Sequence, residues 1–181
     1  MNSLQVILIS GKQGDGKSTL LQEIVRSPGF GKYNFSGIIA KGILNQDGTK
    51  DFVLHDILTN YEIHFASKDH DTSYINYGSY FFNPDAIQYG EKILSKALSE
   101  KVQVIILDEI GPMELNHTIW YNSLVTILKS FKGVLILTIR ESLIEQVLET
   151  FQINPAAVYS AQITNRNEIV SKISEILSLS T

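Results

Sequence analysis

The feature that most constrains this chain is the segment ISGKQGDGKSTL, residues 9–20. It places Gly11, Gly16, Lys17 and Ser18 in the pattern G-x-x-x-x-G-K-[ST], after a predicted strand and at the start of a predicted helix. These glycines let backbone N–H groups curl around a phosphate, and the helix N-terminus adds its positive dipole. The alternative is an ordinary glycine-rich turn, but average composition gives fewer than ~0.01 chance matches in a chain of this length. The segment therefore predicts a phosphate-binding Walker A loop.

Two residues of this loop have distinct expected roles. Lys17 is expected to contact the β and γ phosphates of a nucleotide as a catalytic residue. The hydroxyl of Ser18 is expected to ligate Mg²⁺. We predict nucleotide contacts along the whole loop, which comprises Gly11, Lys12, Gln13, Gly14, Asp15, Gly16, Lys17, Ser18 and Thr19.

A second apolar run ends in two acids. The segment VIILDEIGPMEL, residues 104–115, places Asp108 and Glu109 directly after a predicted buried strand. An acid at the tip of such a strand is the Walker B pattern, so Asp108 is the second expected ligand of Mg²⁺. Since side chains alternate along a strand, we expect Glu109 to point elsewhere and to orient the attacking water as a catalytic residue. The alternatives are a turn-capping acid for Asp108 and a solvated acid, or a partner of a lysine, for Glu109.

The rest of the chain alternates short apolar runs with helical patterns. Runs at residues 4–9, 102–107 and 134–139 predict buried parallel strands. FSGIIAKGIL and FVLHDI flank the turn sequence NQDGTKD, which indicates an antiparallel hairpin. We therefore expect an α/β chain, a single domain over residues 1–181, with an antiparallel β insertion after the first helix.

Two helix starts are predicted from capping residues. Asn83 followed by Pro84 and an early acid predicts the start of a helix. Ser142 with Glu145 predicts a capping box at the start of another. The aromatic segment SYINYGSYFF, residues 73–82, is interpreted either as a partner-binding surface or as core with a stacking wall.

Composition excludes several classes of protein. The chain has no cysteine, which rules out disulfides and cysteine zinc sites and suits a reducing compartment such as the cytoplasm. No apolar run approaches the ~20 residues of a membrane span, and the N-terminus lacks signal-peptide features. A net charge of -4 disfavours a nucleic-acid partner, because such affinity comes from clustered lysine and arginine. The four histidines lack metal-ligand spacing.

Several motifs together resemble a known family. DEIGPMEL, about a hundred residues after the Walker A loop, is similar to the D-E-I-G-x-M-E signature of the small P-loop nucleoside-triphosphatases first described in thermophiles and also found in animals. YGSYFFNPDAIQYGEKIL, TIRES and ITNRNEI resemble other segments of that family. The resemblance implies a P-loop NTPase fold, a three-layer α/β/α arrangement around a mostly parallel, RecA-like sheet with an additional strand. It also implies Mg-dependent hydrolysis of ATP, GTP and other nucleoside triphosphates to NDP and phosphate.

The chain departs from the family at one place. Family members usually carry a polar cluster on the strand after the first helix, whereas GIIAKGIL, residues 37–44, has Lys41 as its one polar side chain. A substrate contact is therefore expected to be missing there. The role of Glu114, part of the same signature, stays open between catalysis and an acid placed favourably in the first turn of a helix.

Two cations complete the predicted site. Arg140 follows the apolar run at residues 134–139, where a catalytic arginine can stabilise charge on the transferred phosphoryl group. Arg166 follows Asn165, which with Glu168 forms a plausible helix cap, while the family resemblance implies a nucleotide contact for Arg166. The absence of an N-K-x-D motif agrees with low base selectivity.

Three functions remain possible on the sequence. Hydrolysis is favoured, because a glutamate directly after the Walker B aspartate suits activation of water. A nucleotide or small-molecule kinase is the alternative, although such enzymes clamp phosphates with several arginines and this chain has only Arg26, Arg140 and Arg166. A nucleotide-dependent binding module is the third. The physiological substrate and the oligomeric state are left open.

Overall fold

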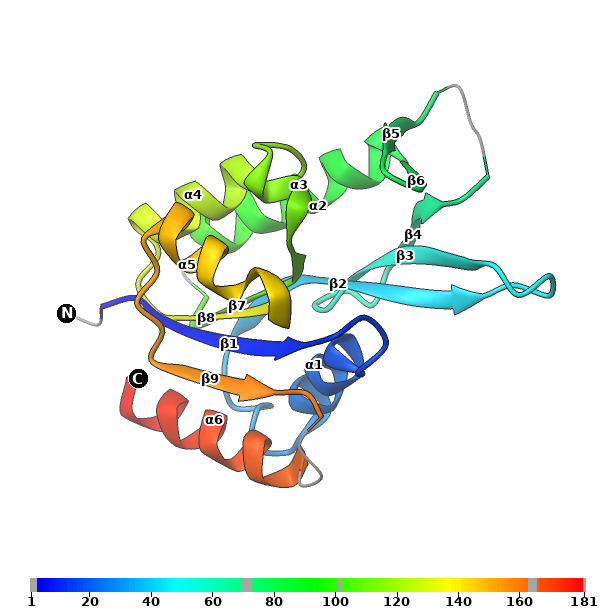
Figure 1. Ribbon diagram of the computed structural model, residues 1–181. Coiled ribbons are helices and arrows are strands. Elements are labelled where there is room, and N and C mark those ends of the chain that lie inside the picture. The colour runs from blue at the N-terminus through cyan, green and yellow to red at the C-terminus, as the bar shows by residue number, and fades with distance from the viewer. Residues whose placement is uncertain (1–2, 70–72, 101, 163–165, 181) are drawn as a thin grey trace.

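One continuous sheet organises the molecule, seen in the computed structural model of Figure 1. The structure describes residues 3–69, 73–100, 102–162 and 166–180. Within these residues the sheet has nine strands, in the order β5-β6-β4-β3-β2-β7-β8-β1-β9. The strands are β1 (Gln5–Gly11), β2 (Phe35–Leu44), β3 (Lys50–Asp56), β4 (Glu62–Ser67), β5 (Ile75–Tyr77), β6 (Tyr80–Phe82), β7 (Val104–Ile110), β8 (Val134–Arg140) and β9 (Ala157–Ser160).

Helices cover both faces of the sheet (Figure 1). They are α1 (Lys17–Arg26), α2 (Pro84–Ser99), α3 (Pro112–Leu115), α4 (Tyr121–Ser130), α5 (Ile144–Phe151) and α6 (Arg166–Ser180), with a 3-10 turn at Glu141–Leu143. On β1, Ile7 and Ile9 pack with residues of α1 and α6, whereas Val6 and Leu8 pack with residues of α2, α4 and α5. This alternation is what a strand buried on both faces requires, and it produces the expected three-layer α/β/α fold.

The sheet has a parallel half and an antiparallel half. β2, β7, β8, β1 and β9 run parallel to one another, and we call them the parallel half. β8 lies between β1, which leads into the Walker A loop, and β7, which carries the two acids, so the expected additional strand is present. Beyond β2, the strands β3, β4, β6 and β5 pair antiparallel and form what we call the arm.

The predicted insertion is antiparallel, as expected, but it is not separate from the core. β2 pairs with β7 through its first residues, Phe35 to Ile38, and with β3 from Ile38 to Leu44. One continuous strand therefore belongs to both halves of the sheet, which makes the arm an extension of the core.

The two predicted helix starts have different outcomes. The side chain of Asn83 accepts a hydrogen bond from the backbone N–H of Asp85 at 3.0 Å, which confirms the cap of α2. The predicted capping box of Ser142 and Glu145 is wrong. A 3-10 turn spans Ser142, α5 begins at Ile144 behind Leu143, and no side chain caps it. Within the described residues, no helix is long and apolar enough to cross a membrane.

Candidate functional site

The Walker A loop connects β1 to α1 at the carboxyl edge of the parallel half. Gly14 and Gly16 have φ angles of 90° and 84°, in the left-handed region that glycine adopts without steric cost. Gly16 is the N-cap of α1, and no side chain caps the helix. The first N–H groups of α1 therefore have no capping side chain to compete with an anion.

Lys17 is held inside the loop that precedes it. Its side chain is buried, and its Nζ donates hydrogen bonds to the carbonyl oxygens of Gly11 at 3.2 Å and Lys12 at 2.9 Å. Both bonds go to neutral carbonyl oxygens, which a phosphate oxygen can replace as the partner of the lysine.

Asp15 closes the loop from the other side. Its Oδ2 accepts hydrogen bonds from the backbone N–H of Lys12 at 2.6 Å and from Nε2 of Gln162 at 2.9 Å. The bond from Lys12, followed by the bond from Gln162, lowers the pKa of Asp15. Because Gln162 follows β9, this carboxylate ties the loop to the segment that leads toward α6.

Asp108 ends the regular part of β7 and is buried. Its Oδ2 accepts a hydrogen bond from the backbone N–H of Ala40 at 3.0 Å, and its Oδ1 accepts one from the hydroxyl of Thr138. Burial, followed by the charge of Glu109, raises the pKa of Asp108 to about 7, and hydrogen bonds from Thr138 and then from Ser18 partly offset this rise. The structure thus brings together the two residues expected to bind Mg²⁺.

A β-bulge separates Glu109 from Asp108. Leu107 pairs with Leu137 of β8, while the next paired residue, Ile110, lies opposite Ile139. Two residues therefore face one across the ladder, and Glu109 adopts φ 64°, a left-handed conformation that is uncommon for a residue with a Cβ. Regular alternation, on which the sequence-based expectation rested, is thus not what separates the two acids.

Thr138 of β8 is a site residue that the sequence reasoning missed. It is buried, its hydroxyl donates to Asp108, and the same oxygen accepts a hydrogen bond from the backbone N–H of Glu109 at 2.8 Å. It therefore holds both the Walker B carboxylate and the bulge. The available signal was a single hydroxyl residue inside the apolar run VLILTIR.

Arg140 lies at the end of β8, in register with Gly11 of β1. Its side chain is exposed and borders the same cavity as the Walker A loop and Glu109. Among the described residues, Arg140 has no ion-pair partner. Its guanidinium is therefore free to meet a phosphate group.

A cavity of about 430 Å³ runs along this edge from the Walker A loop to the arm. That volume falls in the range of small-molecule sites. The near wall is formed by the loop, Glu109 and Arg140, and the far wall by residues of β2, β3, β4 and β6. The far wall comprises Ala40, Lys41, Gly42, Lys50, Phe52, Phe65, Tyr80 and Phe82. Tyr80 and Phe82, from the aromatic segment at residues 73–82, thus form part of this wall, in agreement with the interpretation of that segment as core with a stacking wall.

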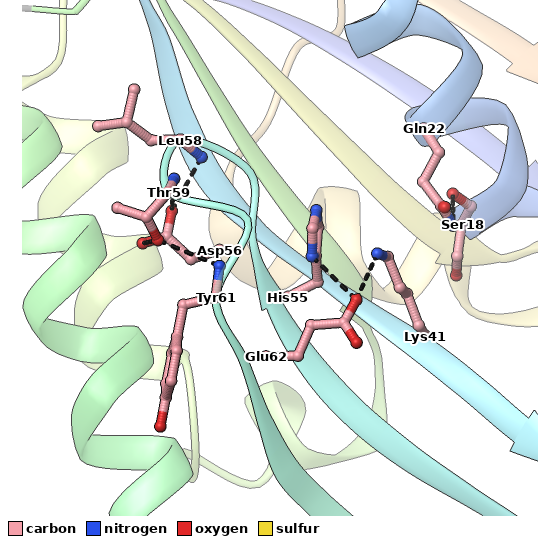
Figure 2. Close-up of polar contacts among 9 residues, drawn as sticks. All are labelled: Ser18, Gln22, Lys41, His55, Asp56, Leu58, Thr59, Tyr61 and Glu62. Atoms are coloured by element: carbon pink, nitrogen blue, oxygen red, sulfur yellow. Dashed lines mark hydrogen bonds and ion pairs between the residues drawn. The ribbon is translucent and has the colours of Figure 1, made fainter.

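Lys41 belongs to a polar group between the arm and the core, drawn in Figure 2. Its Nζ donates to Oε1 of Glu62 at 2.6 Å, and Nδ1 of His55 lies 3.1 Å from the same oxygen. The bond from Lys41 lowers the pKa of Glu62, while burial, followed by the charge of Lys41, lowers that of His55. The one polar side chain of GIIAKGIL is thus paired with a partly exposed acid of the arm.

Glu114 is fully buried beside the bulge. Its Oε2 accepts from the backbone N–H of Gly111 at 2.9 Å and its Oε1 from that of Trp120 at 3.3 Å. Burial raises the pKa of Glu114 to about 7, although hydrogen bonds from the backbone of Gly111, Glu114 and Trp120 act in the opposite direction. These contacts fit the first-turn role in α3 rather than contact with a substrate, since Glu114 is not among the residues that line the cavity.

The remaining predicted residues divide into two groups. Gln13, Gly14 and Thr19 border the cavity, as does Gln22 of α1, whose Nε2 donates to the backbone oxygen of Ser18 at 3.3 Å (Figure 2). Arg166 is the first residue of α6, but its side chain, like Asn165, lies outside the described part of the chain.

The residues at this edge fit a magnesium ion. Mg²⁺ prefers hard oxygen ligands and usually binds through one or two protein groups, with phosphates and water completing its shell. The hydroxyl of Ser18 and the carboxylate of Asp108 are such oxygens, joined by a hydrogen bond. Within the described residues, no cluster of three or more histidine, cysteine, aspartate or glutamate side chains suits a metal held by protein alone.

A family model described as NTPase matches residues 6–174 of the chain. Among curated proteins, the chain is similar to nucleoside-triphosphatase THEP1 of Thermotoga sp. (strain RQ2), with 30% identity over 172 residues and 94% of each chain covered. It is also similar to THEP1 of Sulfolobus acidocaldarius, with 27% identity over 173 residues, covering 92% of this chain and 90% of the relative.

Solved structures share the fold. The crystal structure of THEP1 from Aquifex aeolicus matches with a TM-score of 0.74 and 24% identity, covering 96% of this chain and 99% of that chain. The solution structure of a human cancer-related nucleoside triphosphatase matches with a TM-score of 0.73 and 18% identity, covering 98% and 99%.

Proposed function

This chain belongs to the NTPase family whose model it matches, and from that premise we propose that it hydrolyses nucleoside triphosphates to NDP and phosphate in a Mg-dependent reaction. The observation that carries the proposal is the meeting of a Walker A lysine, a Walker B aspartate and a displaced glutamate at one edge of the sheet. The proposed compartment is the cytoplasm, which suits a chain without cysteine.

Phosphate binding is assigned to the Walker A loop. In the proposed complex, Lys17 exchanges its bonds to the carbonyls of Gly11 and Lys12 for bonds to β and γ phosphate oxygens. Backbone N–H groups between Gly11 and Thr19 surround the β phosphate, where the first turn of α1 adds its dipole. The bond from Asp15 to the backbone of Lys12 holds the loop in shape for this contact.

The metal is assigned to Ser18 and Asp108. A bound Mg²⁺ would neutralise charge on the β and γ phosphates. Ala40 and Thr138 hold the carboxylate of Asp108 in place through one bond to each oxygen. Because these bonds fix its orientation, little reordering of the side chain is needed when the nucleotide arrives.

The chemical step is assigned to Glu109 and Arg140. The oxygen of a water forms a bond to the γ phosphorus, the bond from that phosphorus to the bridging oxygen breaks, and NDP leaves with the electron pair. Glu109 accepts the proton of the water, since the bulge turns it into the cavity apart from Asp108. Arg140 stabilises the charge on the transferred phosphoryl group from the neighbouring strand.

Low base selectivity is part of the proposal. The hydrogen bond from Gln162 to Asp15 places Gln162, which follows β9, beside the Walker A loop, so the nucleoside is proposed to lie on that side. Arg166 is proposed to contact it from the start of α6. An N-K-x-D motif, which would read one base, is absent from the sequence.

Steady-state phosphate release tests the proposal. Wild-type protein should release phosphate from ATP, GTP, CTP and UTP, with kcat/KM values within about tenfold of one another, and chelation of Mg²⁺ should stop the reaction. Lys17→Ala should lower kcat/KM by at least ~10². Lys132→Ala, an exposed lysine at the opposite edge of the sheet, is the matched control. Wild-type turnover by Lys17→Ala would remove the site from this loop.

A further inference from the structure

Apart from the backbone N–H of Ala40, which holds Asp108, the far wall of the cavity has no part in the hydrolysis described above. The Walker A loop, Asp108, Glu109 and Arg140 belong to β1, β7, β8 and α1, whereas the far wall belongs to β2 and the arm. Hydrolysis requires one small nucleophile, water, yet the cavity continues past Glu109 over several side chains that bear no phosphate-binding motif.

The far wall presents aromatic rings. Phe52 and Tyr80 pack edge to face, with ring centroids 5.4 Å apart, and both are only partly buried. Behind them, Phe65 stacks on the buried Trp120 at 5.8 Å and contacts Phe82 at 5.2 Å. Phe52 and Tyr80 pack against the buried cluster that contains Phe65 and Phe82, which supports their exposed ring surface from behind. Such a surface suits a flat ring of a ligand, since offset and edge-to-face contacts between rings are favourable.

Two lysines lie beside these rings: the exposed Lys68, with its Nζ 5.8 Å from the centroid of the Tyr80 ring, and Lys50, which borders the cavity. The charge of Lys41 is already matched by Glu62 at 2.6 Å. Lys50 borders the cavity with its Nζ 5.3 Å from the centroid of the Phe52 ring, and it has no ion-pair partner among the described residues. A partly buried ammonium with no carboxylate partner is a site for a negatively charged group.

Gly42 makes this position of Lys50 possible. A Cβ on Gly42 would lie 2.0 Å from Cε of Lys50, so the lysine side chain crosses the strand where the glycine leaves room. Gly42 pairs with Phe52 across β2 and β3, which places the glycine, the lysine stem and the ring next to one another on one face of the arm. The backbone of the far wall therefore accommodates the cation.

The order of strands sets which end of a nucleotide the far wall faces. From the Walker A loop on β1, the edge passes Arg140 on β8 and Glu109 on β7 before it reaches β2 and β3. A nucleophile that loses its proton to Glu109 approaches the γ phosphorus from that side. A molecule seated on the far wall would thus present its own nucleophile where water otherwise enters.

We propose that the far wall binds a phosphoryl acceptor, a small molecule with a flat aromatic or heteroaromatic ring, a negatively charged group and a hydroxyl group. The proposal rests on the nucleotide site described above. The acceptor's ring lies on Phe52 and Tyr80, and its charged group pairs with Lys50. The hydroxyl oxygen forms a bond to the γ phosphorus, the bond to the bridging oxygen breaks, NDP leaves with the electron pair, and Glu109 takes the hydroxyl proton. The product is the phosphorylated acceptor, and hydrolysis is the reaction without it.

Phosphoryl transfer to defined probes tests the proposal. ATP labelled in its γ phosphate is incubated with Mg²⁺, the protein and one of three probes: a hydroxymethylbenzoate, a pyridine carboxylate with a hydroxymethyl group, or a nucleoside monophosphate with a free hydroxyl. Label should appear in at least one probe at millimolar concentration. Lys50→Ala should lower the labelled product about tenfold or more, because a charged contact is lost. Phosphate release without a probe should stay within about twofold of wild type.

Two further variants keep the test specific. Gly42→Ala displaces only the flexible end of Lys50 and should reproduce the loss of labelled probe in a folded protein. Lys132→Ala should change neither reaction, because it lies at the opposite edge of the sheet.

Three results would contradict these proposals: two concern the acceptor site, and one concerns the nucleotide site. Hydrolysis without label in any probe would overturn the acceptor. An equal loss of hydrolysis in Lys50→Ala without a probe would instead assign Lys50 to the triphosphate, and would overturn it too. Absence of both nucleotide binding and hydrolysis in the wild type would refute the proposed function itself.

Discussion

The two halves of the sheet build their walls of the cavity in different ways. The parallel half contributes strand ends and the loop after β1, so Lys17, Glu109 and Arg140 border one cavity although they are far apart in the sequence. The arm contributes a strand face, where neighbouring antiparallel strands place Gly42 opposite Phe52. Strand ends carry loops whose backbone can surround a ligand, whereas a strand face offers side chains in rows. The first suits phosphate, and the second suits a flat ring.

The halves also differ in how they hold charge. At the end of β7 and in α3, which follows it, burial raises the pKa values of Asp108 and Glu114 to about 7. In the arm, the bond from Lys41 lowers the pKa of Glu62. No positive side chain is among the causes that shift the pKa values of these two buried carboxyls, whereas the acid of the arm is paired with a lysine. The two halves are thus unbalanced in opposite senses: the parallel half has buried acids that no cation offsets, and the arm has Lys50, a cation without an ion-pair partner among the described residues.

Glu109→Gln should have the largest effect on turnover. The amide keeps the shape of the side chain but cannot accept a proton, so kcat should fall by ~10² to 10⁴ while the Kd for Mg-ATP stays near wild type. Asp108→Asn should also weaken the Mg-dependent part of binding, because a neutral amide is a poorer partner for the metal. Isothermal titration with and without Mg²⁺, beside phosphate release, measures both. Normal hydrolysis by Glu109→Gln would show that another group accepts the proton of the attacking water.

Arg140→Ala should lower kcat by ~10³, because a guanidinium that stabilises the transferred phosphoryl group is removed. Single-turnover phosphate release measures the chemical step. Arg26→Ala is the matched control, because Arg26 is an exposed arginine in the last turn of α1. A loss of kcat below about tenfold would show that Arg140 has a structural role only. The parallel half would then contribute one catalytic residue fewer than proposed.

Glu114 should make the stability of the parallel half depend on pH. Its pKa in the folded protein, about 7, lies above the ordinary value of 4.5, so the folded state binds the proton more tightly. Stability from this group is therefore full below pH 4.5 and is lost as pH rises toward about 7. The free energy of unfolding should fall by about 3 kcal/mol over this range, which is the shift in the pKa of Glu114 converted to free energy.

Urea unfolding of Glu114→Gln across this range measures the effect. The free-energy difference between wild type and variant should shift by about that amount between pH 4.5 and about 8. Glu149→Gln, at an exposed acid of α5, should show no comparable shift. A pH-independent difference for Glu114→Gln would mean that the carboxylate is matched after all.

Glu62→Gln should have the smallest effect. The pair with Lys41 is partly exposed, so its loss should cost less than about 1 kcal/mol of unfolding free energy, and kcat should stay within about twofold. Thermal unfolding and phosphate release measure the two quantities. A large loss of activity would show that the arm takes part in hydrolysis. The two halves of the sheet would then no longer differ in function as proposed.

The sequence predicted the parallel half much better than the arm. The Walker A loop and the acid at the end of β7 depend on local spacing, and the family resemblance implied the additional strand. The bulge at Glu109 was not foreseeable from the alternation of side chains, because Thr138 of another strand holds it. The far wall was missed for a similar reason: Lys50 and Tyr80 border one cavity only because β3, β4 and β6 pair side by side in the sheet.

The sharing of β2 between both halves has a mechanical consequence. The backbone N–H of Ala40 holds the carboxylate of Asp108, and two residues later the same strand carries Gly42 against Lys50. Because β2 also pairs with β3, a tilt of the arm would move β2, and with it the backbone N–H of Ala40. Filling or emptying the far wall would then change how firmly β2 holds the Walker B acid, and the rate of phosphoryl cleavage would depend on a wall of the cavity that lies apart from the Walker A loop.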